Sequence, residues 1–209
     1  MFIKAIHPDT LLGIRQLNQV SFINSTYLAG GTALALQIGH RVSVDLDFFT
    51  PIDFDEKEVA PQFQKLPIFK DLSLTYKTVF GRLSETKFSL FYYKYDVLGA
   101  FEKFEGINVL SKKDIAVMKL HAIEDRGTKR DFIDLFFLLR EFSLDQVLDF
   151  YDQKYKCLES HLFPLIKSLN YFADAEHDEW EPQMLVAFDW EEIKKFFNME
   201  ALRLAEEYL

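Results

Sequence analysis

The sequence predicts an α+β fold in which a small mixed sheet flanked by helices precedes a C-terminal helical part. Apolar segments rich in aromatic and β-branched residues are typical of strands, and they occur at 27–29, 44–48, 73–80 and 86–94. We expect the last two to form a hairpin. From Ser111 onward the apolar residues recur at helical spacing. This pattern predicts helices near 112–125, 130–140, 144–156 and 159–169, and another beginning at Asp189. The predicted parts are residues 1–110 and 111–209.

Two helices are expected on either side of the first two predicted strands. Residues 9–23 are expected to form a helix that is capped by Asp9 or Thr10 after Pro8, because short polar side chains accept hydrogen bonds from free helix N–H groups. Residues 55–65 are expected to form a surface helix, which is bounded by Pro51 and Pro67.

A glycine pair joins the first predicted strand to a helix. Gly30 and Gly31 allow a sharp turn and the close approach of a ligand. Thr32 is expected to cap the helix formed by residues 33–37. Because the N-terminus of a helix carries free N–H groups and partial positive charge, this turn is suited to binding phosphate.

Two carboxylates follow on the next predicted strand. Side chains two residues apart share a face of a strand, so Ser43, Asp45 and Asp47 are expected to point one way. The core-facing residues of the same strand are then Val44, Leu46 and Phe48. Two carboxylates on one face repel each other unless a cation lies between them. Mg²⁺ binds through one or two carboxylates plus substrate phosphates, and Arg41 precedes the pair.

A second charged segment lies on the first helix of the C-terminal part. Lys112, Lys119 and Arg126 are seven residues apart and therefore fall on nearly one helix face, where they could meet a triphosphate or an RNA backbone. The expected core stripe of this helix consists of Ile115, Met118 and Ala122.

The next helix begins with Arg130, Asp131 and Asp134 after a break at Gly127 and Thr128. A purely structural interpretation is a solvated charged face with an Arg130–Asp134 pair, which would contribute only a few tenths of a kcal/mol. Both interpretations remain open at the level of these residues.

Composition limits the class of protein. The chain has 209 residues, of which 49% are apolar, and a formal net charge of −9. The charge argues against broad non-specific binding of nucleic acid. A single cysteine, Cys157, rules out a disulfide framework, and no apolar run is long enough to span a membrane. The N-terminus lacks the shape of a signal peptide, so we expect a cytoplasmic protein without a membrane partner.

Both segments resemble the AbiEii/AbiGii toxin-type family of the nucleotidyltransferase superfamily. The first matches its G-G-T-x-L…R-x-S-x-D-x-D pattern at Gly30, Gly31, Thr32, Leu34, Arg41, Ser43, Asp45 and Asp47. The second matches its K-x-x-A-x-x-x-R-x-x-x-R-D-x-x-D pattern at Lys119, Ala122, Arg126, Arg130, Asp131 and Asp134. The resemblance covers about residues 25 to 140 and has a weaker echo at 189–196.

The resemblance implies a nucleotidyltransferase that moves a nucleotide from a nucleoside triphosphate to an acceptor hydroxyl. One or two Mg²⁺ ions would be held by Asp45 and Asp47, and phosphates by Gly30, Gly31, Thr32, Arg41, Ser43, Lys119 and Arg126. The toxin family implies an RNA acceptor such as tRNA, or a protein, and a cognate antitoxin. The alternative is a catalytically inactive nucleotide sensor on the same fold.

The sequence departs from the superfamily at the third carboxylate, which many members carry on a later strand. Here that strand has no acid, and Ser89 stands where one would be sought. We expect Asp131 to complete the metal site or to accept the proton of the attacking hydroxyl, with Asp134 as the second choice. Asp131 would then have to approach Asp45 and Asp47, with the C-terminal helices packed across an active-site cleft.

Overall fold

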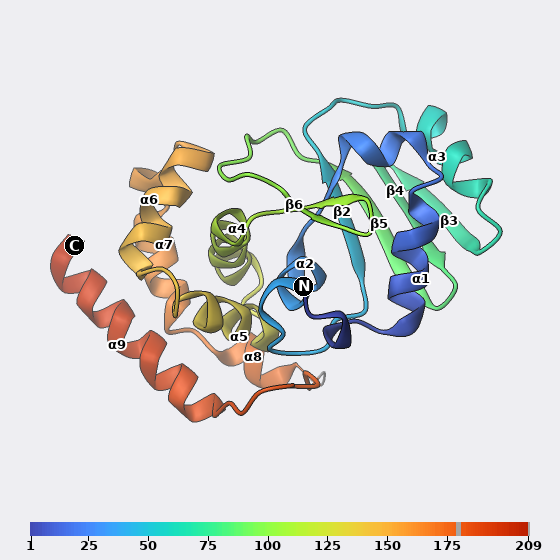
Figure 1. Ribbon diagram of the computed structural model, residues 1–209. Coiled ribbons are helices and arrows are strands. Elements are labelled where there is room, and N and C mark those ends of the chain that lie inside the picture. Colours follow the sequence, from blue (N-terminus) through green and yellow to red (C-terminus); the bar gives the residue numbers. More distant parts are fainter. Residues whose placement is uncertain (179–180, 209) are drawn as a thin grey trace. The chain divides into compact units, whose positions relative to one another are not determined.

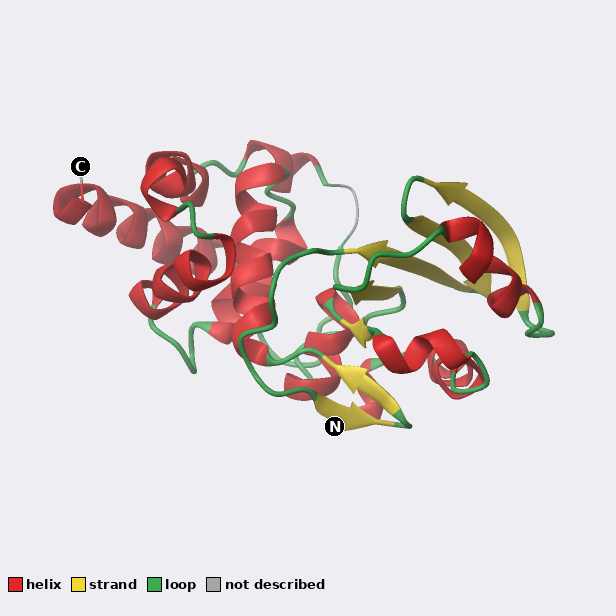
Figure 2. Cartoon of the chain, turned by 90° about the horizontal axis from the view of Figure 1, so that it is seen from above, coloured by secondary structure: helices red, strands yellow, loops and turns green. Residues whose placement is uncertain are grey.

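The computed structural model describes residues 1–178 and 181–208. The chain forms two compact units, Met1–Ser111 and Lys112–Leu209. Strands occur in the first unit, and the described part of the second unit is helical (Figures 1 and 2). The expected α+β class, a mixed sheet followed by a helical part, is thus confirmed. None of the described helices is both long and apolar enough to cross a membrane.

The first unit is built on a seven-stranded mixed sheet with the order β3-β4-β5-β2-β1-β7-β6. The strands are β1 (Tyr27–Leu28), β2 (Leu46–Thr50), β3 (Phe69–Thr75), β4 (Thr78–Leu83), β5 (Thr86–Tyr92), β6 (Glu102–Phe104) and β7 (Ile107–Val109). β2 runs parallel to β5, and β1 runs parallel to β7, whereas the other neighbours are antiparallel. The helices are α1 (Pro8–Leu17), α2 (Gly30–Ile38) and α3 (Glu56–Gln64), with 3₁₀ turns at Ile3–Ala5 and Ser21–Ser25.

One face of this sheet is the core of the first unit. In β2 the side chains of Leu46 and Phe48 are fully buried, while the residues between them are partly exposed. The ring of Phe88 on β5 lies 5.9 Å from that of Phe48 and 4.8 Å from that of Phe63 on α3. This alternation fixes the register of β2, because a slip of one residue would turn Asp47 into the core.

Two expected elements of the first unit differ from the structure. The predicted strand 73–80 is interrupted by a turn at Tyr76–Lys77, so β3, β4 and β5 form a three-stranded meander. Lys77 adopts a φ of 50°, a left-handed conformation that is uncommon for lysine and that the sequence does not predict. The predicted helix 9–23 ends at Leu17, and its cap is the side chain of His7.

The second unit contains α4 (Lys112–Asp125), α5 (Lys129–Leu138), α6 (Leu144–Tyr155), α7 (Leu158–Leu169), α8 (Ala173–His177) and α9 (Trp190–Tyr208). Its core includes Phe132, whose ring lies 5.3 Å from that of Phe197. A fully buried ion pair, with Lys154 Nζ 2.9 Å from Asp114 Oδ1, joins α6 to α4. The acidic residues of the stretch 173–182 favour a loop at the level of sequence, but residues 173–177 form α8, and Glu179 lies outside the described residues.

The expected core stripe of α4 is only partly correct. Ile115 is buried, but Met118 and Ala122 are partly exposed, and Val117 and Leu120 are buried in their place. The buried side of this helix is therefore wide, because α5, α6 and α7 all pack against it.

Candidate active site

The glycine turn lies against the strand that carries the acids. The Ala29 N–H donates to the Asp47 carbonyl at 2.9 Å, which places the start of α2 beside β2. Gly30 has a φ of +65°, in the left-handed region that favours glycine. A Cβ atom built on Gly30 would lie 3.5 Å from Asp47 Oδ2, so the carboxylate faces the turn.

The second glycine is required by the side chains that lie over it. A Cβ atom at Gly31 would overlap the Nη2 atom of Arg41 and would lie 3.2 Å from Ser43 Oγ. Arg41 is only 2% exposed, and its Nη1 donates to the Val42 carbonyl at 3.1 Å. The guanidinium is thus held directly against the turn.

Thr32 does not cap α2, contrary to the sequence prediction. The cap position is Ala29, and no side chain accepts a hydrogen bond there. The buried hydroxyl of Thr32 lies 2.9 Å from Ser43 Oγ and is hydrogen-bonded to the Asp45 carbonyl oxygen. Thr32 therefore ties the first turn of α2 to the segment that leads into β2.

The two carboxylates are partly exposed. Asp45 directly precedes β2 and Asp47 is its second residue. The expectation that Val44 would point into the core is wrong, because the chain is not yet in a strand there and Val44 is 44% exposed. Asp47 pairs in register with Ser89 on β5, so these two residues share a face of the sheet. The neighbouring strand thus presents a hydroxyl, and not an acid, beside Asp47.

The same face carries aromatic rings that sequence reasoning missed. Phe49 pairs in register with Phe91, and their ring centroids are 5.2 Å apart. Phe80 on β4 lies 5.7 Å from Phe91, and Tyr93 lies 5.5 Å from Phe49. All four are partly exposed. Alternation from Asp47 to Phe49 was the signal that could have located this aromatic face.

In the second unit, Lys119 is enclosed by two carboxylates. Its side chain is buried, with Nζ 2.9 Å from Asp131 Oδ1 and 2.7 Å from Asp134 Oδ2. Both aspartates are fully buried at the start of α5. The cluster therefore joins α4 to α5 through charge-assisted hydrogen bonds.

Asp131 is the centre of this cluster. Arg126 contacts its carboxylate through Nε at 2.9 Å and Nη2 at 3.1 Å, and the Thr128 hydroxyl donates to it at 2.6 Å. Burial would raise the pKa of Asp131, but the charge of Lys119 and the bonds from Arg126 and Thr128 outweigh it and hold the pKa well below its usual range. A carboxylate bound in this way orients its two cations and is a weak proton acceptor.

The predicted cationic strip is therefore neutralised along its length. Lys112 forms an ion pair with Glu141, and Lys119 and Arg126 contact Asp131. Only Arg126 keeps about half of its side chain exposed, at 52%. The site residues thus form two groups: Gly30, Gly31, Thr32, Arg41, Ser43, Asp45 and Asp47 in the first unit, and Lys119, Arg126 and Asp131 in the second.

A glycine turn beside the strand that carries Asp47, with Asp45 directly before that strand, is the arrangement expected of a nucleotidyltransferase, and the chain belongs to this class of enzyme. A family model described as the nucleotidyl transferase AbiEii toxin of type IV toxin–antitoxin systems matches residues 14–98 and 92–200. The chain belongs to this family.

Individual relatives agree with this assignment. An uncharacterised protein of Aquifex aeolicus (strain VF5) is 37% identical over an alignment of 202 residues that covers 94% of each chain. Among solved structures, JHP933 from Helicobacter pylori superposes with a TM-score of 0.54 at 18% identity, covering 96% of this chain and 91% of that one. MenT4, a nucleotidyltransferase toxin from Mycobacterium tuberculosis H37Rv, gives 0.51 at 16% identity, covering 94% and 86%. These two likenesses concern the fold.

Proposed function

We propose that this nucleotidyltransferase transfers a nucleotide from a nucleoside triphosphate to an acceptor hydroxyl with the help of Mg²⁺, and that it acts as the toxin of a toxin–antitoxin or abortive-infection pair. The observation that carries the proposal is the contact between the glycine turn and the acid strand. Asp47 Oδ2 faces Gly30 while Arg41 and Ser43 lie over Gly31. Groups suited to binding phosphate and groups suited to binding metal therefore lie together, which supports the proposal.

The residues present fit a magnesium ion. Asp45 and Asp47 are partly exposed carboxylates, and Asp47 points to the turn where phosphates would bind. Mg²⁺ prefers such a set, with one or two carboxylates completed by phosphate oxygens and water. When bound there, one or two ions would neutralise triphosphate charge and stabilise the attacking and leaving oxygens.

The first unit would hold the triphosphate. The N-terminus of α2 has no side-chain cap, so its N–H groups remain suited to phosphate oxygens. Arg41, Thr32 and Ser43 keep the turn in place, and Arg41 adds a positive charge. The acceptor oxygen forms a bond to the α-phosphorus, while the bond from that phosphorus to the bridging oxygen of the β-phosphate breaks and pyrophosphate leaves.

We assign Arg126, whose side chain is about half exposed, to neutralising the charge of the departing pyrophosphate. Lys119 is buried between Asp131 and Asp134, so its contacts favour holding these carboxylates in place over the predicted contact with phosphate. For Asp131 the contacts favour a positioning role over the predicted roles of metal ligand or base, because four hydrogen bonds already occupy its oxygens. The proposal leaves the deprotonation of the acceptor hydroxyl to water or to Asp45.

The proposed acceptor is an RNA end, such as that of tRNA, ahead of a protein hydroxyl. The partly exposed rings of Phe49, Phe80 and Phe91 share the face of Asp47 and would stack on bases. A toxin of this kind would act in the cytoplasm and would require a cognate antitoxin.

The second candidate is a nucleotide sensor without catalytic activity. The specific observation in its favour is Ser89, which occupies the register position beside Asp47 where a third acid is absent. Such a sensor would bind nucleotide and release no pyrophosphate.

Pyrophosphate release from each of the four nucleoside triphosphates, with Mg²⁺ and total RNA, tests the proposal. We expect release with at least one triphosphate, and a fall of about 10²–10³-fold in Asp45→Asn and Asp47→Asn, because each removes a charge that holds the metal. Asp71→Asn, an exposed acid on β3 with a left-handed backbone, is the matched control and should retain full activity. Nucleotide binding without release would favour the sensor.

A further inference from the structure

The C-terminal helix α9 buries one side, and its opposite side is exposed to solvent. Its inward residues recur at helical spacing and are fully or almost fully buried: Ile193, Phe197, Ala201 and Leu204. Successive residues turn by about 100° around a helix, so the opposite side carries Lys195, Met199, Leu202 and Glu206. Met199 is 61% exposed and Leu202 is 62% exposed. We call these four residues the outer stripe.

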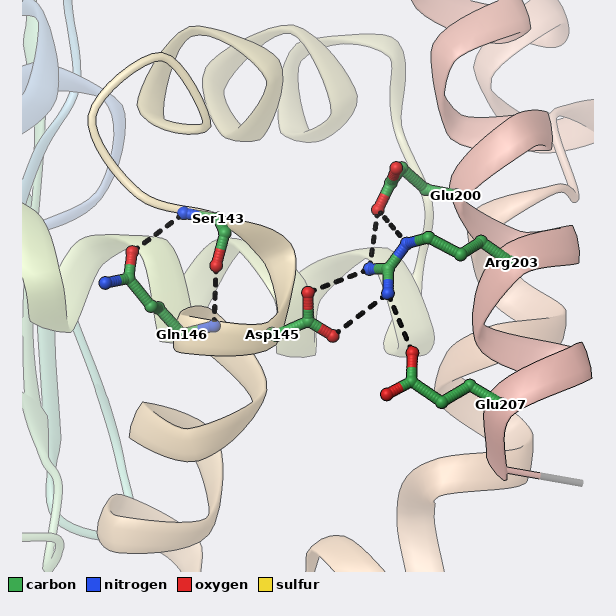
Figure 3. Close-up of polar contacts among 6 residues, drawn as sticks. All are labelled: Ser143, Asp145, Gln146, Glu200, Arg203 and Glu207. Carbon is green, nitrogen blue, oxygen red and sulfur yellow. Dashed lines mark hydrogen bonds and ion pairs between the residues drawn. The ribbon is translucent and has the colours of Figure 1, made fainter.

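Arg203 fixes which side of α9 faces outward. Its guanidinium contacts both oxygens of Asp145 on α6, at 3.2 and 3.0 Å (Figure 3). On its own helix it also contacts Glu200 at 2.8 Å and Glu207 at 3.0 Å. Because this fork–fork contact is directional, the helix cannot roll to bury the outer stripe without breaking it.

The outer stripe is complementary to itself. It has two large apolar residues in the middle, a positive charge at one end and a negative charge at the other. An antiparallel second copy of α9, related by a two-fold axis midway between Met199 and Leu202, would place Met199 against Leu202 of the other copy. The same operation places Lys195 against Glu206, twice. Such an isologous contact closes on itself.

Further apolar surface lies beside the stripe. Phe163 on α7 is 60% exposed, and a shallow groove between α7 and α9 is lined by Phe163, Ile166, Ala201, Leu202 and Ala205. A second helix seated on the outer stripe would therefore also cover part of this groove. Contiguous exposed apolar residues with a charged rim are typical of an interaction surface.

We propose that the protein forms a two-fold symmetric dimer through the outer stripe of α9. A second copy is favoured as the partner because the charges at the two ends match when the stripe meets itself in the antiparallel direction, whereas a parallel contact would place like charges together. The inference is independent of nucleotidyl transfer, since none of its residues belongs to the candidate active site.

Sedimentation equilibrium of the full chain over a range of concentrations tests the dimer. We expect Leu202→Asp to raise the dimer dissociation constant at least tenfold without unfolding the protein, because the side chain is exposed in the monomer. Lys195→Glu and Glu206→Lys should each raise it about tenfold, since each creates two like-charge contacts. Lys57→Glu, on the exposed side of α3, makes the same change in net charge as Lys195→Glu and should leave the constant within twofold.

Exchanging the two charges tests whether Lys195 and Glu206 meet across an interface. Lys195 and Glu206 are eleven residues apart, or about 16 Å along the helix, so they cannot pair within one copy. If the double variant Lys195→Glu/Glu206→Lys regains the wild-type dissociation constant, the two residues meet across an interface. A wild-type protein that stays monomeric at every concentration, or a double variant weaker than both single ones, would overturn the proposal.

Discussion

Replacing Asp131 by Asn removes one charge from a buried cluster while keeping the shape of the side chain. Asp131 is fully buried and accepts hydrogen bonds from Lys119, Arg126 and Thr128. The asparagine has one carbonyl oxygen to offer these donors, and its amide group faces two cations. We therefore expect Asp131→Asn to lower the free energy of unfolding as well as activity.

The size of the loss in the free energy of unfolding depends on the contacts that Lys119 and Arg126 keep in the variant. Removing one partner of a buried ion pair costs about 3–5 kcal/mol. Lys119 keeps Asp134 at 2.7 Å, and the half-exposed Arg126 can be rehydrated, so the loss should fall at the lower end, about 3 kcal/mol. For a chain of about 200 residues this corresponds to a decrease in Tm of roughly 6–12 °C.

Thermal unfolding followed by circular dichroism measures this loss, with Glu141→Gln as the control. Glu141 forms an exposed pair with Lys112, so its replacement should cost at most about 1 kcal/mol. Because the folded pKa of Asp131 is lowered, its stabilisation is full above the unfolded pKa of about 4 and declines as the pH falls below it. The difference in Tm between wild type and Asp131→Asn should therefore become smaller as the pH falls below about 4. An unchanged Tm at pH 7 together with lost activity would refute this reasoning. It would favour the role predicted from sequence, in which Asp131 binds metal or accepts a proton.

Further substitutions test the neighbouring contacts by thermal or urea unfolding. Gly31→Ala should lower stability by about 1–3 kcal/mol and weaken triphosphate binding, because its Cβ would displace the Arg41 guanidinium; unchanged binding would separate Arg41 from the site. Lys154→Met should cost about 3–5 kcal/mol by leaving the Asp114 charge buried without that ammonium, and adding Asp114→Leu should recover most of it; no recovery would contradict the pairing. Ser143→Ala should cost about 1 kcal/mol through the capping box seen in Figure 3, and a neutral result would show that the box adds nothing.

The helices could be predicted closely because their signals are local. α3 begins and ends within a residue of the predicted bounds 55–65, and α4 to α7 within a residue or two of theirs. The strands β6 and β7 were missed because three residues are too few to show a period. The turn at Tyr76–Lys77 was missed because it contains neither glycine nor proline. Its position depends on pairing with neighbouring strands.

The two parts of the candidate site also differ in how well the sequence predicted them. The glycine turn and the two acids beside it could be located from sequence because Gly30, Gly31, Asp45 and Asp47 lie close together in the chain and match one pattern of the family. The role of Asp131 could not be read from its position. It depends on Lys119, twelve residues away on another helix, and on the direction in which Arg126 folds back over it. Whether a carboxylate is available for chemistry depends on which donors occupy it.

Transfer of label from a nucleoside triphosphate tests the central claim, nucleotidyl transfer, most directly. The protein is incubated with Mg²⁺, total RNA and a triphosphate carrying phosphorus label at either the α or the γ position. We predict that α-label becomes covalently attached to an acceptor, that γ-label is released in pyrophosphate, and that both outcomes are lost in Asp45→Asn and Asp47→Asn. Attachment of the γ-label would instead indicate phosphoryl transfer, and attachment of neither label with any of the four triphosphates would contradict the account.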